Sequence, residues 1–337
     1  MKYRPLGATG VQVSALCLGT MMFGEWGNPD HDESIRIIHR ALDEGINFVD
    51  TADVYSAGES EEIVGKAVRG RRDSVVLATK VFMPGLGGVL DGGTSRRHVM
   101  LQVEESLRRL GTDWIDLYQL HRNDADTPLE ETLGALTDLV RQGKIRYLGV
   151  STGHAADPVA IQFTGWRMVE SLWLSERRGL ERFVSTQPPY SIFSREVERE
   201  IFPVCERFGF GAIVWSPLEG GWLAGRYRKG QAPPADSRAS NETEFGAFVR
   251  GNFDLTNARG QRRLEVVEEL VGMAEQIDAS LAAYATAWTL RHQAVTSAII
   301  GPRLMRHLED GLAALPVRIP DEHLARIDAL VEPGTRT

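Results

Sequence analysis

The chain has 337 residues, of which 42% are hydrophobic and 25% are charged, and its formal net charge is −8. This composition is typical of a globular protein. The acidic balance argues against general binding to nucleic acid or to anionic membranes, because both require a positive surface. No run of about 18 apolar residues occurs that could span a membrane, and the N-terminal segment lacks the apolar stretch of a signal peptide. Cys17 and Cys205 stand singly in apolar segments, so we interpret them as reduced core residues of a cytoplasmic protein; a disulfide is the less favoured alternative.

Short apolar segments of strand type alternate with amphipathic segments of helix type almost to the end of the chain. Eight of the apolar segments lack polar alternation, as expected of strands that are covered on both faces. They span residues 14–19, 46–50, 74–80, 114–120, 145–151, 182–187, 211–216 and 297–300. Eight strand–helix units predict an α/β fold of the (β/α)8 or TIM barrel type, in a single domain that covers residues 1–337. The competing fold, an open doubly wound sheet, favours a GxGxxG turn after an early strand, whereas GTMMFGEWGNPD follows the first strand here.

The helical segments carry their own boundary signals. In TPLEETLGALTDLVRQGK, we expect Thr127 to be the N-cap, Pro128 to occupy the first helical position and Glu130 to complete a capping box. Ser60 is expected to cap the helix EEIVGKAV. These signals place the helices between the predicted strands.

Two segments fall outside the eight units, and a last helix follows them. Residues 1–13 are expected to form a β-hairpin that closes the floor of the barrel. Residues 217–262, which include the polar stretch QAPPADSRASNETEFG, are expected to form a long loop after strand seven. A last helix near DEHLARIDALV is expected to pack outside the barrel.

Three consecutive predicted strands end on polar residues. INFVD ends on Asp50, with Tyr55 five residues later, SVVLATK ends on Lys80, and WIDLYQLH ends on His121. Neighbouring strands lie about 5 Å apart, and barrel enzymes carry their catalytic groups at the carboxyl ends of the strands, so we expect the four side chains to converge. Each residue alone also has a structural interpretation, as a turn cap, a paired buried lysine or a core histidine. Their joint position at adjacent strand ends favours a catalytic site.

The charges of these groups suggest their roles. A free tyrosine, with a pKa near ~10, is a weak acid at neutral pH, and the Lys80 ammonium is expected to stabilise the phenolate and lower that pKa. Asp50 is expected to keep Lys80 charged, and His121 to hydrogen-bond the substrate oxygen. The pattern predicts Tyr55 as the general acid in carbonyl reduction. Because the sequence has no HxH, HExxH or paired-cysteine motif for a metal, a nicotinamide cofactor is the expected hydride source.

At these residues the chain resembles the aldo-keto reductases. The segments GINFVDTADVYSAGESEEIVGKAV, LATKV, RLGTDWIDLYQLHR and GKIRYLGVS are similar to successive signature blocks of that family, and the resemblance extends over residues 2–315. It implies a (β/α)8 barrel, NADPH as the hydride donor with NADH as the alternative, and a catalytic tetrad of Asp50, Tyr55, Lys80 and His121. The segment WSPL and the long loop after it resemble a subgroup that includes bacterial sugar and small-aldehyde reductases and potassium-channel β subunits.

The resemblance also implies a set of cofactor contacts. Ser151 and Gln187 match residues that hold the nicotinamide carboxamide, and Trp215 matches an aromatic on which the nicotinamide stacks. Segment 216–227 resembles the pyrophosphate loop, and segment 299–312 resembles the adenosine-binding turn. The implied cofactor residues are Gly19, Thr20, Met21, Asp50, Ser151, Thr152, Gln187, Trp215, Ser216, Pro217, Leu218, Gly220, Gly225, Arg226, Ile300, Gly301, Arg303, His307, Asp310 and Gly311.

Arg303 and the adjacent helix N-terminus suit the 2′-phosphate of NADPH. The chain departs from the family pattern at Thr152, His307 and Gly311, where asparagine, glutamine or arginine, and asparagine are usual. Trp215 has an alternative interpretation as an ordinary core aromatic.

The loops after strands one, three, four and seven are expected to form the substrate pocket, with a wall that suits a small aldehyde, ketone or sugar. The candidate wall residues are Met22, Phe23, Trp26, Tyr55, Phe82, Met83, His121, Arg122 and Asn123. Two other functions remain open. Lys80 could form a Schiff base in an aldolase, which the adjacent Asp50 opposes, or the chain could be a cofactor-sensing binding subunit with slow turnover. The sequence is compatible with a homo-oligomer.

Overall fold

Eight parallel strands close into a barrel. The computed structural model describes residues 1–84, 91–154, 157, 162–234, 237 and 253–337, and within them the strand order is β10-β3-β4-β5-β6-β7-β8-β9. The predicted (β/α)8 barrel is confirmed. The strands are β3 (Leu16–Gly19), β4 (Phe48–Asp50), β5 (Val76–Val81), β6 (Ile115–Leu120), β7 (Ile145–Ser151), β8 (Phe183–Gln187), β9 (Gly211–Val214) and β10 (Val295–Ile300).

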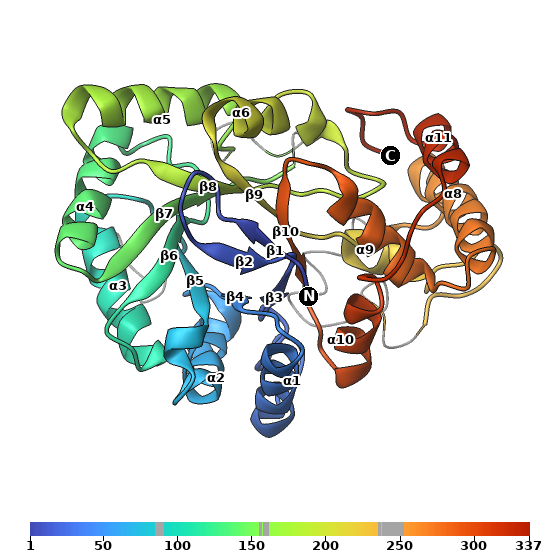
Figure 1. The fold of residues 1–337 in the computed structure, drawn as a ribbon, viewed down its shortest axis with the longest axis horizontal. Helices are drawn as coiled ribbons and strands as arrows, with labels where there is room; N and C mark the ends of the chain where they lie inside the picture. The colour runs from blue at the N-terminus through green and yellow to red at the C-terminus, as the bar shows by residue number, and fades with distance from the viewer. Residues whose placement is uncertain (85–90, 155–156, 158–161, 235–236, 238–252) are drawn as a thin grey trace.

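Helices surround this strand ring (Figure 1). The helices of the eight units are α1 (His31–Asp43), α2 (Glu59–Val68), α3 (Arg96–Leu110), α4 (Leu129–Arg141), α5 (Gly165–Arg178), α6 (Ile201–Phe208), α9 (Leu281–Arg291) and α10 (Met305–Leu312). Two further helices, α8 (Ala258–Glu275) and α11 (Asp321–Leu330), lie side by side at the edge of the molecule. The predicted last helix outside the barrel is α11. None of the described helices is long and apolar enough to cross a membrane.

A two-stranded antiparallel hairpin, β1 (Tyr3–Pro5) and β2 (Gln12–Ser14), closes one end of the barrel, as expected for residues 1–13. Figure 1 shows the hairpin across the middle of the strand ring. Its side chains Leu6 and Val13 are fully buried and form one apolar cluster with inward-facing strand residues, among them Phe48, Ala78 and Leu117. Burial of this cluster removes apolar surface from water and fills the barrel floor.

The strand register places polar side chains directly above this apolar floor. Side chains alternate between the two faces of a strand, so a residue two positions after an inward-facing one also faces inward. Asp50, Lys80 and Gln119 stand two positions after the floor residues of β4, β5 and β6. Asp50 is paired with Ala78, and Lys80 with Gln119, in adjacent strands. The sequence therefore builds an apolar layer and then a polar layer inside the same barrel.

Some predicted boundaries were wrong by a few residues. Residues Arg72–Ser74 form a short 3₁₀ turn, so the strand predicted at 74–80 begins at Val76. The strand predicted at 211–216 ends at Val214, and Trp215 forms an isolated bridge with Pro189. The loop predicted at 217–262 ends where α8 begins, and its residues 235–236 and 238–252 lie outside the described residues.

The two predicted helix caps were also wrong. The N-cap of α4 is Pro128, and the hydroxyl of Thr127 donates instead to Asp124 Oδ2 at 2.7 Å. Ser60 lies inside α2, where its Oγ donates to the carbonyl oxygen of Thr20 at 2.9 Å. At Thr127 the competing acceptor is the side chain of Asp124, three residues earlier, whereas at Ser60 it is a backbone carbonyl 40 positions away that only the fold brings near.

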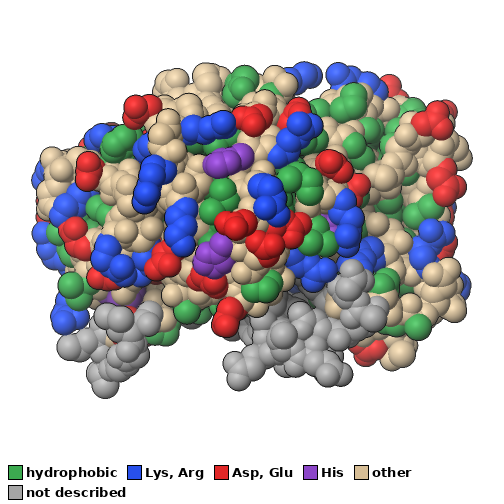
Figure 2. All heavy atoms as spheres, turned by 90° about the horizontal axis from the view of Figure 1, so that it is seen from below, with side chains coloured by type: hydrophobic (Ala, Val, Ile, Leu, Met, Phe, Trp, Pro, Cys, Tyr) green, Lys and Arg blue, Asp and Glu red, His purple; other side chains and the backbone are tan. Residues whose placement is uncertain are grey.

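The distribution of charge on the surface and the state of the two cysteines agree with the sequence analysis. Figure 2, which shows the molecule from below the view of Figure 1, has Lys and Arg side chains interspersed with Asp and Glu. Cys17 and Cys205 are both buried and free, as predicted.

Candidate active site

Asp50, Tyr55, Lys80 and His121 meet at the carboxyl end of the barrel. Asp50 ends β4, Tyr55 lies in a 3₁₀ turn directly after it, Lys80 is the penultimate residue of β5, and His121 follows β6. The rings of Tyr55 and His121 are 5.8 Å apart, and Lys80 Nζ lies 4.8 Å from the centre of the Tyr55 ring. The structure thus brings the four predicted catalytic side chains together.

Every N–H of the Lys80 ammonium has a partner. Lys80 is fully buried, and its Nζ donates to Asp50 Oδ1 at 2.5 Å, to the carbonyl oxygen of Thr51 at 2.7 Å and to Tyr55 Oη at 3.2 Å. Burial alone would lower the pKa of Lys80, but the charge of Asp50 and the Tyr55 contact outweigh it and raise the pKa. Because an ammonium has three N–H groups and no acceptor, the oxygen of Tyr55 must accept from Lys80. The phenol proton of Tyr55 therefore points away from Lys80.

The Asp50 carboxylate is held by three side chains. Oδ1 accepts from Lys80, while Oδ2 accepts from Gln119 Nε2 at 2.9 Å and from Gln187 Nε2 at 2.8 Å. These two amides give the second oxygen of Asp50 its hydrogen-bond partners, and a buried carboxylate oxygen without partners would cost free energy. Gln187 was predicted as a cofactor contact, and in the structure its side-chain amide belongs to the hydrogen-bond network of Asp50. Ser151, another predicted cofactor contact, lies next to it, and its Oγ donates to the backbone carbonyl oxygen of Gln187 at 3.0 Å.

Sequence reasoning missed Gln119. The signal was present, because a fully buried strand carries a glutamine two positions after Leu117 and two before His121. That spacing places all three side chains on the inward face of one strand.

The prediction that Tyr55 has a lowered pKa was wrong. Burial raises the pKa of Tyr55, and Lys80 only partly offsets this rise. The main physical reason is the burial of the phenol, and Asp50, 2.5 Å from Lys80, further opposes the lowering effect of the ammonium. Tyr55 therefore keeps its proton at neutral pH, which suits a group that donates a proton.

His121 is held as a neutral imidazole. Burial, followed by the positive charges of Lys80 and Arg122, lowers the pKa of His121 well below its ordinary value. Among the described residues, Nδ1 of His121 is buried without a hydrogen-bond partner. A neutral imidazole next to Tyr55 can hydrogen-bond a substrate oxygen without competing with the ammonium.

The turn that carries Tyr55 has a strained backbone. Ser56 and Ala57 have φ angles of 47° and 54°, and Gly58 has 95°. Residues other than glycine adopt this region at a cost of about 1–3 kcal/mol each, and such strain concentrates at functional sites. The surrounding contacts must therefore hold this turn in place.

The predicted cofactor residues at the ends of β7 to β9 lie next to one another. Trp215 Nε1 donates to the carbonyl oxygen of Thr152 at 3.2 Å, which ties the end of β9 to the end of β7. The ring of His154 packs edge-on against Trp215 with a centroid distance of 5.0 Å. Trp215 is only partly buried, so its ring does not belong to the fully buried core.

The segment after Trp215 has an unusual backbone. Positive φ angles occur at Ser216, Glu219, Gly220, Gly221 and Gly225. Glu219, at φ 45°, is buried and is held by Arg263 at 2.9 Å and by Ser191 at 3.0 Å. Successive turns of this kind direct backbone N–H groups toward one side, an arrangement that binds anions.

The predicted adenosine segment is rich in positive charge. Burial lowers the pKa of His307, and the charges of Arg306, Arg303 and Arg226 add to this effect, whereas Asp310 opposes it. The Nδ1 of the neutral His307 accepts from the backbone N–H of Arg303 at 3.3 Å. The N-terminus of α10 has no side-chain cap. These groups together can receive a phosphate.

Two glycines among the predicted cofactor residues allow neighbouring segments to pack closely against them. A Cβ at Gly19 would lie 2.4 Å from Ile299 Cγ2, and one at Gly311 would lie 2.8 Å from Ile300 Cδ1. The neighbouring Thr20 is fully buried, and its hydroxyl donates to the carbonyl oxygen of Asp50 at 3.1 Å. The start of the β3–α1 loop is thereby fixed against the tetrad.

Trp26, a predicted wall residue, lies close to the tetrad, with its ring 6.1 Å from that of Tyr55. The prediction that Phe23 lines the pocket was wrong, because Phe23 is fully buried in the core between the barrel and its helices. Asn123 is buried, and its Oδ1 accepts from Arg167 Nε at 3.3 Å. The other predicted wall residues are partly buried: Met22, Phe82, Met83 and Arg122.

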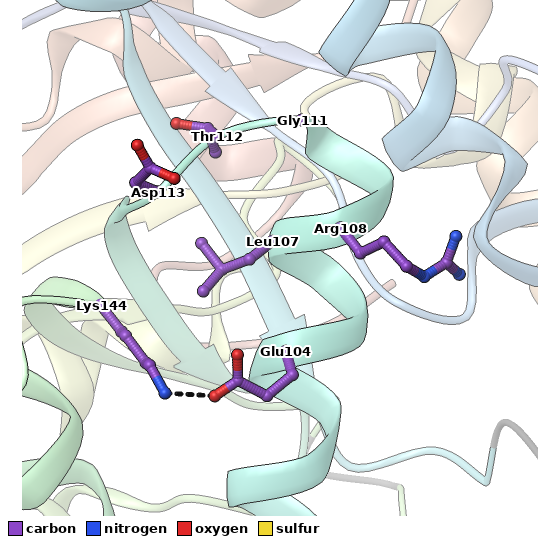
Figure 3. A pocket seen from close by; sticks show the side chains of 7 residues that line it. All are labelled: Glu104, Leu107, Arg108, Gly111, Thr112, Asp113 and Lys144. Carbon is purple, nitrogen blue, oxygen red and sulfur yellow. Dashed lines mark hydrogen bonds and ion pairs between the residues drawn. The ribbon is translucent and has the colours of Figure 1, made fainter.

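A surface hollow at the opposite end of the barrel has no part in this site. It is lined by Glu104, Leu107, Arg108, Gly111, Thr112, Asp113 and Lys144. Figure 3 shows these side chains between the end of α3 and the residues that precede β6 and β7, with an ion pair between Lys144 and Glu104. The hollow lies where strands begin, whereas the tetrad lies where they end.

Comparisons with known proteins agree with this geometry. The profile of the Aldo/keto reductase family matches residues 15–332. The uncharacterized oxidoreductase YrpG of Bacillus subtilis (strain 168) is 36% identical, with 100% of this chain and 98% of that protein aligned. A probable voltage-gated potassium channel subunit beta of Oryza sativa subsp. japonica is 34% identical, over 98% of this chain and 97% of that protein. The versiconal hemiacetal acetate reductase of Aspergillus parasiticus is 32% identical over the whole length of both chains.

The barrel, the site and these relatives define an oxidoreductase of the TIM-barrel type. The chain belongs to the aldo/keto reductase family. Membership supports carbonyl reduction as the class of reaction and a nicotinamide dinucleotide as the cofactor.

Proposed function

We propose that this protein is an NADPH-dependent reductase that converts a small aldehyde or ketone to its alcohol, reversibly, with Tyr55 as the general acid. One observation carries the proposal. All three N–H groups of Lys80 are engaged, one of them by Tyr55 Oη, so the phenol proton is directed away from Lys80 and is free to be donated to a substrate oxygen. A tyrosine that merely stabilised the fold would have no need of this arrangement.

The chain's residues fit the cofactor. Ser151, Gln187 and Trp215 would hold the nicotinamide end, the positive-φ segment after Trp215 would receive the pyrophosphate, and Arg303 with the α10 N-terminus would receive the 2′-phosphate. The open space around Gly301, where a Cβ would meet no atom within 4 Å, leaves room beside this terminus. NADPH, when bound, supplies the hydride that adds to the carbonyl carbon.

The residues of the tetrad manage the proton and the charge. His121 positions the carbonyl oxygen next to Tyr55, and Tyr55 Oη transfers its proton to that oxygen as negative charge develops there. The phenolate left behind is stabilised at once by the N–H of Lys80 that Tyr55 already accepts. Asp50 keeps Lys80 charged and fixed in direction, and Gln119 and Gln187 hold Asp50. In the reverse direction, the phenolate takes the proton back from the alcohol.

The Schiff-base alternative needs a neutral Lys80 that can reach a substrate carbonyl. Lys80 is instead fully buried, raised in pKa and bonded on all three N–H groups. No observation favours the aldolase over the reductase.

The test is a fluorescence titration with NADPH and with NADH, followed by turnover measurements on a panel of aldehydes and ketones. We expect NADPH to bind more tightly than NADH and at least one small carbonyl to be reduced. Absence of binding to both cofactors would contradict the proposal. Tight binding with negligible turnover over the whole panel would favour the cofactor-sensing subunit.

A further inference from the structure

The loop between β3 and α1, residues 20–30, is tied to the turn that carries Tyr55. The backbone N–H of Trp26 donates to Ser56 Oγ at 3.2 Å, and the same hydroxyl donates to the carbonyl oxygen of Phe23 at 3.2 Å. Ser56 is the residue after Tyr55 and has a positive φ angle. The position of Trp26 is thus linked directly to the position of the proposed acid.

Glu59 forms a second and stronger link between the β3–α1 loop and the segment that follows Tyr55. It is the first residue of α2, yet both of its oxygens bond to the β3–α1 segment. Oε2 accepts from the backbone N–H of Glu25 at 2.8 Å, and Oε1 lies 2.6 Å from Nε2 of His31, the first residue of α1. One carboxylate therefore holds the segment on both sides of Trp26.

The backbone of the loop is shaped around this carboxylate. Gly24 has a φ angle of 92°, and a Cβ at this position would lie 2.3 Å from Glu59 Oε2. A side chain at residue 24 would therefore push the carboxylate out of place. The close approach and the two hydrogen bonds indicate a built contact rather than a chance surface pair.

The charge of Glu59 suits this contact. Partial burial would raise the pKa of Glu59, but the hydrogen bonds from His31 and from the N–H of Glu25 outweigh it and lower the pKa. The side chains of Glu59 and His31 are 25% and 33% exposed, so water reaches the pair but does not surround it. The α2 N-terminus further favours a carboxylate at this position.

We propose that Glu59 is a positioning residue that sets substrate selectivity, by holding Trp26 beside Tyr55 as one wall of the carbonyl pocket. This inference rests on the proposed function. With the indole ring 6.1 Å from the Tyr55 ring, a substrate with a flat apolar group next to its carbonyl gains contact area on Trp26. A short aliphatic aldehyde reaches Tyr55 without that contact. The enzyme therefore favours the flat, apolar carbonyl.

The experiment compares benzaldehyde with propanal in the wild type and in Glu59→Ala and Glu59→Gln. For Glu59→Ala, we expect KM for benzaldehyde to rise about tenfold, equivalent to about 1.4 kcal/mol, with kcat for both aldehydes and KM for propanal changed by less than about twofold. Glu59→Gln retains an acceptor for the Glu25 N–H, so we expect a smaller rise. Glu62→Gln, an exposed glutamate of the same helix, is the matched control and should leave the ratio of the two aldehydes unchanged.

Hydrogen exchange of the peptide that covers residues 20–30 provides a readout that needs no turnover. Loss of the Glu59 contacts should speed exchange at Glu25 and Trp26 in Glu59→Ala and not in Glu62→Gln. The proposal is overturned if exchange in this loop does not change, or if kcat falls equally for both aldehydes, since the latter would mean that Glu59 only supports the Tyr55 turn. If the wild type reduces neither aldehyde although it is folded, the proposed function fails with the selectivity, and the exchange data still decide whether Glu59 holds the loop.

Discussion

Replacing Gln119 by leucine should lower the free energy of unfolding by about 2 kcal/mol. Gln119 is fully buried, and its amide donates to Asp50 Oδ2 at 2.9 Å. A hydrogen bond to a charged group contributes about 1.5–3 kcal/mol, and leucine of similar size leaves neither a large cavity nor a new unpaired polar group at residue 119. Gln187 still donates to the same oxygen, so the loss should not approach the larger cost of a buried charge left without partners.

The assay is urea unfolding followed by circular dichroism, with Gln142→Leu as the control. Gln142 is exposed at the end of α4, so its replacement should change the free energy of unfolding by no more than about 0.5 kcal/mol. The reasoning about the Asp50 network is refuted if Gln119→Leu is no more destabilising than Gln142→Leu.

Two further outcomes follow from buried and charged groups. Burial, with Glu61 nearby, raises the pKa of Asp53 to about 8. The folded protein therefore keeps a proton on Asp53 that the unfolded chain loses above about pH 4. The stability that this proton contributes is complete below about pH 4 and is lost as pH rises through about 8. Asp53 should therefore make the unfolding free energy of the wild type fall by about 1.4 kcal/mol per pH unit between about pH 5 and 8, and Asp53→Asn should abolish this contribution in urea unfolding. An unchanged slope in Asp53→Asn would argue against a buried neutral Asp53. Arg303→Ala should weaken NADPH more than NADH in fluorescence titrations, whereas equal losses would move the 2′-phosphate contact elsewhere, with Arg306 as the next candidate.

The sequence predicts the barrel well because the same strand–helix pattern is repeated eight times along the chain. Each of the eight predicted strands has the apolar run of a strand that is covered on both faces, so an error at one boundary does not alter the topology. Asp50, Lys80 and His121 were predictable for the same reason, since they occupy equivalent places at the ends of three successive strands.

The features that the sequence did not reveal depend on partners far away in the chain. Ser60 has the side chain of a helix cap, but its hydroxyl donates to the carbonyl oxygen of Thr20, 40 positions away, which only the fold brings near. The pKa of Tyr55 depends first on the burial of the phenol and then on the opposing charges of Lys80 and Asp50, none of which can be judged before the fold is known. The contact of Glu59 with His31 joins residues 28 positions apart, and no sequence pattern pairs them.

The central claim is that Tyr55 donates the proton to the carbonyl, and Tyr55→Phe tests it most directly. With NADPH and the best carbonyl of the panel, we expect kcat to fall by about 10²–10⁴-fold, the usual contribution of a general acid, while the affinity for NADPH changes by less than about twofold. Tyr147→Phe, at a tyrosine that packs near the floor of the barrel, is the control and should retain wild-type turnover. A Tyr55→Phe variant that reduced the carbonyl at the wild-type rate would contradict the account.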